Sequence, residues 1–79
     1  MRYYKAWYVR EREAMAVDEH FPEWVVYATS DAEAEAKVLR AMERTEPDRG
    51  FCVRLILVPD EDEGTVAFAT ARQLGQALD

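Results

Sequence analysis

The residues best suited to chemistry in this sequence are carboxylates, and they gather in two dense groups. The first group lies between residues 11 and 23, and the second is the run Asp60–Glu63. In the second group, the spacing Asp60-x-Asp62-x-Gly64 is faintly similar to a calcium-binding loop. A twelve-residue EF-hand loop also needs further oxygen ligands, a different glycine spacing and a closing glutamate, which are missing here. We therefore expect no dedicated metal site.

The sequence lacks the combinations of residues that nucleophilic or acid–base catalysis needs. His20, the only histidine, follows Glu19 in a polar stretch, which is typical of a surface residue. Cys52, the only cysteine, falls in an expected strand and has no supporting histidine, so it should behave as a small hydrophobic residue. The three glycines stand apart from one another and form no phosphate-binding loop. The sequence thus predicts neither an enzyme nor a bound cofactor.

Charge is segregated along the chain, although the net charge is only −6. Residues 1–10 carry +3, residues 11–35 carry −7, residues 36–58 carry +2 and residues 59–79 carry −4. A general nucleic-acid binder needs a basic face to replace counterions on phosphate, so we expect no direct binding of nucleic acid. Acidic segments that converge in space would instead steer the protein towards basic partners. Solvated loops that keep a small protein soluble are the simpler alternative.

The clearest element that could position these groups is a helix within residues 29–47. Ser30 is a good N-cap, and Glu33 can reach back to the amide of Ser30 to complete a capping box. Pro47 should end the helix. Its apolar stripe needs a sheet to cover and consists of Ala34, Val38, Leu39, Ala41 and Met42.

Alternating apolar residues predict the strands of that sheet. We expect them at residues 3–12, 24–29, 51–58 and 65–69. Between the first two strands, Phe21 or Met15 should fold back over the core. A short final helix should begin at Thr70, with Leu74 and Leu78 as its apolar anchors.

The order β-β-α-β-β-α predicts a single α+β domain over residues 1–79. Its architecture would be a two-layer sandwich, with one main helix and a short C-terminal helix on a mainly antiparallel sheet of three to four strands. We expect antiparallel pairing of the first two strands. An alternative is a split β-α-β unit, as in ferredoxin-like folds, in which strands 24–29 and 51–58 run parallel through a crossover.

The aromatic residues concentrate on the first two expected strands, and a core of this size cannot bury all of them. We expect some rings, including those of Tyr4 and Tyr8, on the outer sheet face as interface anchors, with ordinary core packing as the alternative. A core this small usually leaves about 3–5 kcal/mol of net stability, so docking on a partner or forming a homodimer would be a natural supplement. The lone cysteine fits a reducing cytoplasm, and the longest apolar run, Leu55–Val58, is too short to cross a bilayer.

These patterns favour a small, acidic, non-catalytic protein-binding module of the cytoplasm. Its sharper form is an inhibitor, of the type that phages direct at host defence or transcription machinery, docking on a basic nucleic-acid-binding protein. The expected partner contacts are Glu11, Glu13, Asp18, Glu19, Glu23, Asp60, Glu61, Asp62, Glu63, Tyr4 and Tyr8. The alternative is a small ferredoxin-like dimer that binds or turns over a ligand in an aromatic cleft beside Tyr8, Trp24 and Tyr27.

Overall fold

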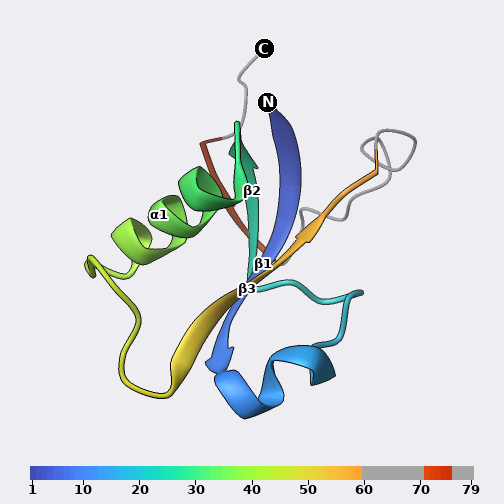
Figure 1. The fold of residues 1–79 in the computed structure, drawn as a ribbon. Helices are drawn as coiled ribbons and strands as arrows, with labels where there is room; N and C mark the ends of the chain where they lie inside the picture. The colour runs from blue at the N-terminus through green and yellow to red at the C-terminus, as the bar shows by residue number, and fades with distance from the viewer. Residues whose placement is uncertain (60–70, 76–79) are drawn as a thin grey trace.

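The computed structural model describes residues 1–59 and 71–75 of the 79-residue chain. Over these residues it is an α+β fold in which one main helix lies against a four-stranded sheet (Figure 1). In chain order the elements are β1 (Arg2–Arg10), the 3-10 helix η1 (Glu11–Ala16), β2 (Trp24–Ala28), α1 (Asp31–Ala41), β3 (Phe51–Leu57) and β4 (Arg72–Leu74).

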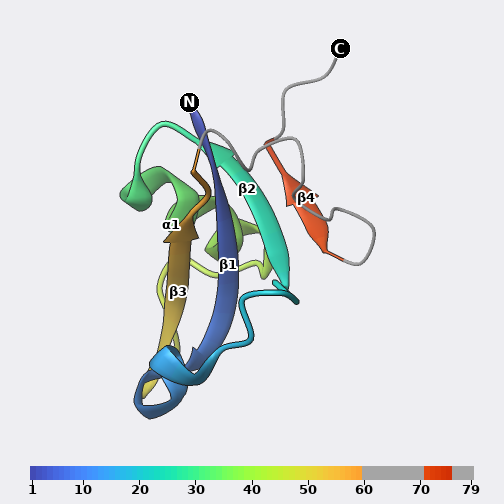
Figure 2. The same ribbon diagram turned by 90° about the vertical axis from the view of Figure 1, so that its right-hand side faces the viewer.

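The sheet has the strand order β3-β1-β2-β4, which is easiest to follow in Figure 2. β1 is antiparallel to both of its neighbours, which confirms the expected pairing of the first two strands. Because β2 and β3 flank β1 and both oppose it, they run parallel to each other, and α1 connects them across β1. This is the split β-α-β arrangement that the sequence left as the alternative. β4 pairs in parallel with β2, so the sheet is mixed, and the expected mainly antiparallel character is only partly matched.

The main core lies between α1 and one face of the sheet. β1 contributes Tyr4 and Ala6, which lie opposite Val26 and Trp24 in the register of β2. Val53 and Leu55 of β3 pack against the same cluster, as the alternation of that strand predicts. From the helix, the stripe is confirmed where it is buried, at Ala34, Val38 and Leu39.

α1 begins where the sequence predicts and ends earlier. The Ser30 hydroxyl accepts a hydrogen bond from the Glu33 amide at 3.1 Å. The Glu33 carboxylate reaches back one residue further than expected, accepting from both the amide (3.2 Å) and the hydroxyl (2.8 Å) of Thr29. At the other end the helix stops at Ala41 instead of continuing towards Pro47, because Glu43 adopts a left-handed conformation (φ 60°). That conformation cannot continue a right-handed helix.

The C-terminal part also differs from expectation. Residues 72–74 form the strand β4, where a helix starting at Thr70 was predicted. Pairing with β2 satisfies the backbone of this segment, and the tertiary contact overrides a weak local helix preference. The expected strand at 65–69, the cap Thr70 and the anchor Leu78 lie outside the described residues. The first strand, expected over residues 3–12, ends at Arg10, because the 3-10 helix η1 begins at Glu11.

Candidate protein-binding surface

The segment between β1 and β2, residues 11–23, carries five exposed carboxylates and two large exposed apolar side chains. η1 leaves the end of β1, where the Glu11 amide donates to the Gly50 carbonyl at 2.9 Å. The chain then returns along the sheet to the start of β2 (Figure 2). Its carbonyls accept hydrogen bonds from two β1 side chains, Lys5 Nζ to Glu19 (2.9 Å) and Trp7 Nε1 to Phe21 (3.2 Å). Lys5 and Trp7 belong to the sheet face opposite α1, so this segment is fixed to that face.

Two large apolar side chains of this segment are exposed. Met15 keeps 84% of its surface accessible and Phe21 keeps 69%. The expectation that one of them folds over the core is therefore wrong. A turn fixes the backbone beside Phe21, since its amide donates to the Asp18 carbonyl at 3.0 Å and the His20 amide donates to Asp18 Oδ1 at 2.9 Å.

Of the predicted acidic contacts, five lie in this segment, and all five are exposed. Glu11 and Glu13 are on η1, and Asp18 and Glu19 are in the turn that follows. Glu23 also has a structural role. Its Oε1 accepts a hydrogen bond from the Tyr8 amide at 2.9 Å, which holds the end of the segment against β1.

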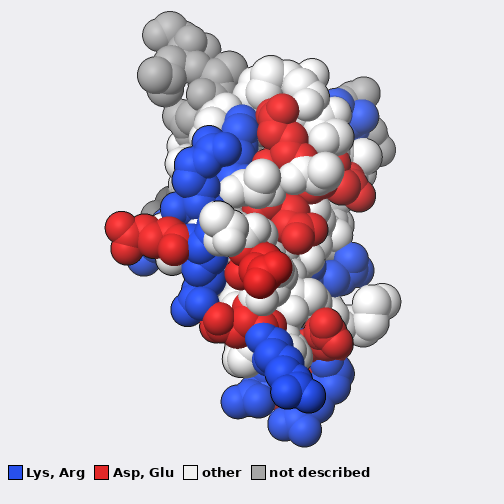
Figure 3. All heavy atoms as spheres, turned by 60° about the vertical axis from the view of Figure 1, so that its left-hand side comes forward, with Lys and Arg blue, Asp and Glu red and all other residues white. Residues whose placement is uncertain are grey.

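The second acidic group, Asp60–Glu63, lies outside the described residues. That it converges in space with residues 11–23 therefore stays a prediction. Residues 1–59 and 71–75 contain all ten basic residues and eleven of the sixteen acidic ones, which gives this part of the chain a net charge of −1. The face in Figure 3 accordingly shows acidic side chains along its middle, with basic ones along one edge and at one end. The excess of negative charge is therefore carried by Asp60–Glu63 and Asp79.

The two predicted tyrosine anchors differ in position. Tyr4 is only 5% exposed and packs in the core on the helix-covered face, so it has no surface to offer a partner. Burial raises the pKa of the Tyr4 phenol, and a hydrogen bond to Asp31 raises it further. A strand with aromatic residues on both faces does not reveal which face the helix covers.

Tyr8 is half-buried and belongs to a stack of rings and arginines at the end of the sheet. Its ring stacks on Phe51 with centroids 5.2 Å apart, and its hydroxyl accepts the Asp48 amide at 2.8 Å. Arg10 lies over Phe51 at 5.2 Å, and Arg44, which is paired with Asp48, lies 6.0 Å from the centre of Tyr8. The ring therefore serves to join β1, β3 and the turn after α1. Sequence reasoning missed both arginines, because only the strand register brings Arg10 opposite Phe51.

The aromatic cleft of the alternative hypothesis is not formed. Tyr8 and Trp24 lie on the face covered by α1, while Tyr27 lies on the opposite face, where its ring meets that of Tyr3 with centroids 4.7 Å apart. Residues Tyr8, Trp24 and Tyr27 therefore do not line one pocket.

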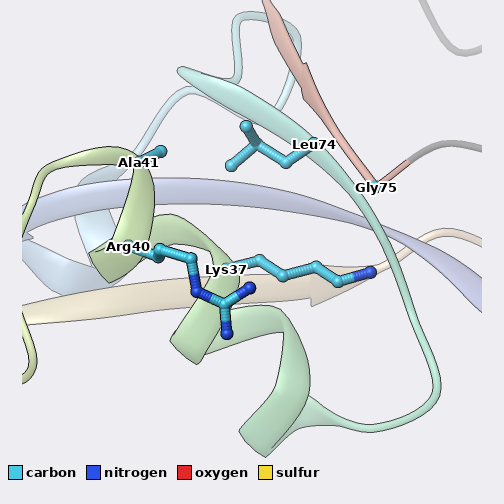
Figure 4. A pocket seen from close by; sticks show the side chains of 5 residues that line it. All are labelled: Lys37, Arg40, Ala41, Leu74 and Gly75. Atoms are coloured by element: carbon cyan, nitrogen blue, oxygen red, sulfur yellow. The ribbon is translucent and has the colours of Figure 1, made fainter.

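A hollow of about 270 Å³ lies instead between α1 and β4 (Figure 4), and it is lined by Lys37, Arg40, Ala41, Leu74 and Gly75. The Lys37 amine donates to the Tyr27 carbonyl at 2.6 Å and lies 3.4 Å from the Glu33 carboxylate. Its charge thus helps to hold α1 against β2. A ligand site needs several polar groups converging on a largely apolar cavity. Of the described side chains lining this hollow, only those of Lys37 and Arg40 are polar, and the Lys37 amine already bonds Tyr27 and Glu33. We assign it no ligand.

Neither metal binding nor nucleophilic chemistry gains support from the geometry. Across residues 1–59 and 71–75, no three His, Cys, Asp or Glu side chains gather as a metal site would require. Burial, followed by the nearby Glu11 and Glu35 carboxylates, raises the pKa of the Cys52 thiol. A raised pKa keeps the thiol protonated and weakens it as a nucleophile.

In that same part of the chain, no helix has the length and apolar character needed to span a membrane. Comparison with known proteins found no matching family model, curated protein or solved structure.

Proposed function

We propose that this protein is a small, non-catalytic protein-binding module whose segment 11–23 docks on a partner with a basic surface. The observation that carries the proposal is the exposure of Phe21 and Met15 on a segment whose backbone is pinned to the sheet. Two large apolar side chains held out to solvent on a fixed backbone are suited to filling apolar pockets of a partner. Because the backbone is already ordered, binding would lose little conformational entropy.

The charges around these side chains define the partner. Exposed carboxylates of Glu11, Glu13, Asp18 and Glu19 share the segment with Phe21 and Met15. A complementary surface would present an apolar pocket rimmed by lysine or arginine. The run Asp60–Glu63 would add long-range attraction, which raises the association rate more than the final affinity. A protein that itself binds nucleic acid through such a surface fits this description, and docking there would inhibit it by competition.

The test begins with affinity capture from cells of the source organism, and it continues with binding kinetics against the captured protein. Phe21→Ser should raise the dissociation rate, because the ring would leave its pocket. The fold should survive, since Phe21 contributes its backbone amide and carbonyl to the structure. Ala36→Ser is the control, as Ala36 is also exposed but lies on α1, on the other face of the sheet. Equal effects of the two substitutions, or none from Phe21→Ser, would refute the assignment of this segment.

A second series separates steering from docking. Replacing Asp60–Glu63 by four lysines should lower the association rate and flatten its dependence on salt, because exposed charges are largely screened beyond about 8 Å at physiological ionic strength. The dissociation rate should hardly change. If the variant and the wild type associate at equal rates at every salt concentration, the run has no steering role.

A further inference from the structure

One edge of the sheet is left open among the described residues. β3 is the outermost strand, and β1 is the only described strand that pairs with it. At the two ends of this pairing, the Val58 amide donates to the Tyr3 carbonyl and the Glu11 amide donates to the Gly50 carbonyl. Antiparallel strands alternate in the direction of their backbone groups. Cys52, Arg54 and Ile56 therefore turn their amides and carbonyls towards β1, and Val53, Leu55 and Leu57 turn theirs outward.

The sequence of this edge is unusually suited to pairing. β3 is seven residues long, FCVRLIL, with no proline and Arg54 as its single charge. Natural proteins usually protect such an edge with charges, proline, a bulge or a covering segment. Leu57, at the end of the strand, is 45% exposed. The protection visible here is slight and comes from Arg54, whose Nη1 donates to the outward Leu55 carbonyl at 2.8 Å.

We propose that the edge of β3 pairs with the β3 edge of a second copy, in antiparallel orientation, about a two-fold axis at Leu55. In this register Leu55 faces its own copy, and Val53 faces Leu57 of the second copy on both sides of the axis. Val53, Leu55 and Leu57 of the two strands then exchange hydrogen bonds. The four described strands of each copy form one continuous sheet, with both α1 helices on the same side.

Charge and burial favour a two-fold axis at Leu55 over an axis at Arg54 or at Val53. An axis at Arg54 would set two guanidinium groups directly opposite each other, which is unfavourable. An axis at Val53 would leave Leu57 without a partner and still exposed. With the axis at Leu55, each Arg54 meets Ile56 of the second copy, and both Leu57 side chains become covered. The apolar character of the strand and the position of its one charge therefore favour a second copy of this chain as the occupant.

The first test is the mass of the full chain in solution, measured by sedimentation velocity over a range of concentrations. We expect a reversible dimer of twice the 9.1 kDa chain mass. Leu57→Lys should raise the dimer dissociation constant at least about tenfold, because it places a charge on the pairing edge. Phe21→Ser should leave the dimer intact, so failure here is distinguishable from failure of the proposed partner surface. Arg54→Met should tighten the dimer, because it uncovers the Leu55 carbonyl.

A crosslinking experiment tests the register without relying on affinity. In a Cys52→Ser background, the double variant Arg54→Cys, Ile56→Cys should form disulfides between copies, because these positions are directly opposite in a non-hydrogen-bonded pair. Each single variant should stay uncrosslinked. A monomer at every concentration, a dimer unaffected by Leu57→Lys, or crosslinking of Arg54→Cys alone would overturn the proposal.

Discussion

Glu43 offers a direct test of why α1 ends at Ala41. Its amide donates to the Arg40 carbonyl at 2.9 Å, and the next amide, of Arg44, donates to the Leu39 carbonyl at 2.8 Å. With φ 60° at Glu43, these two bonds form a Schellman motif. Glycine is the preferred residue at this position, because a side chain in the left-handed region costs roughly 1–2 kcal/mol.

Glu43→Gly should therefore stabilise the protein. The relief of strain is partly offset, since glycine gives the unfolded chain extra entropy worth about 0.4–1 kcal/mol. The net gain should be about 0.5–1 kcal/mol, which raises the melting temperature by roughly 2–8 °C for a domain of this size. Urea unfolding followed by circular dichroism would measure the free energy, and calorimetry the melting temperature.

Two controls separate backbone strain from other effects. Glu43→Ala removes a carboxylate that the helix dipole disfavours at a C-terminus, but it keeps the strain, so it should gain less than the glycine variant. Ala36→Gly places glycine at an exposed position inside α1 and should cost about 0.8–1 kcal/mol. If Glu43→Gly were no more stable than Glu43→Ala, the left-handed residue would not be what limits the helix.

Three further substitutions probe other contacts of the fold. Ser30→Ala removes the N-cap acceptor of α1 and should cost about 1 kcal/mol, or roughly 4–8 °C in melting temperature, measured by calorimetry. Hydrogen bonds from the hydroxyl and then the amide of Thr29, followed by Lys37, lower the pKa of Glu33. The stabilisation from the ionised carboxylate is therefore present above the ordinary value of 4.5 and is lost as the pH falls through the lower folded pKa. Unfolding curves of the wild type and Glu33→Gln should differ at pH 6 and converge in acid. Gly75→Ala should destabilise the protein by about 1–2 kcal/mol in urea titrations, because φ is 63° and the new Cβ would lie against the Lys37 side chain and 3.0 Å from the Tyr27 carbonyl oxygen.

The parts of the fold that were predictable from sequence are those governed by local chemistry. The Ser30 cap and the alternation of β1, β2 and β3 follow from residues that are neighbours in the chain. The end of α1 was not predictable, because glutamate is uncommon in a left-handed conformation and the Schellman bonds depend on the path towards the turn at residues 48–50. β4 was missed for a related reason, since pairing with β2 decides the conformation of a segment with weak preference of its own.

The candidate site likewise has features that the sequence predicts and features that it does not. The exposure of the five carboxylates in residues 11–23 follows from their charge, and the sequence predicted them as surface groups. The exposure of Phe21 and Met15 did not follow, because an apolar residue in a loop is expected to cover the core. The hydrogen bonds from Lys5 and Trp7 to this segment hold its backbone in place, and they join residues 14 positions apart in the chain. Only the three-dimensional arrangement reveals such a contact.

Site-specific photo-crosslinking at position 21 tests the central claim most directly. A photoreactive phenylalanine analogue would replace Phe21 in the full chain, expressed in cells of the source organism, with position 36 as the control because Ala36 is exposed on α1, on the other face of the sheet. The account predicts a crosslink from position 21, and none from position 36, to one protein with a basic surface, and the yield should fall as salt is added to a reconstituted mixture. Crosslinks from position 21 only to further copies of this chain, or equal crosslinks from both positions, would contradict it.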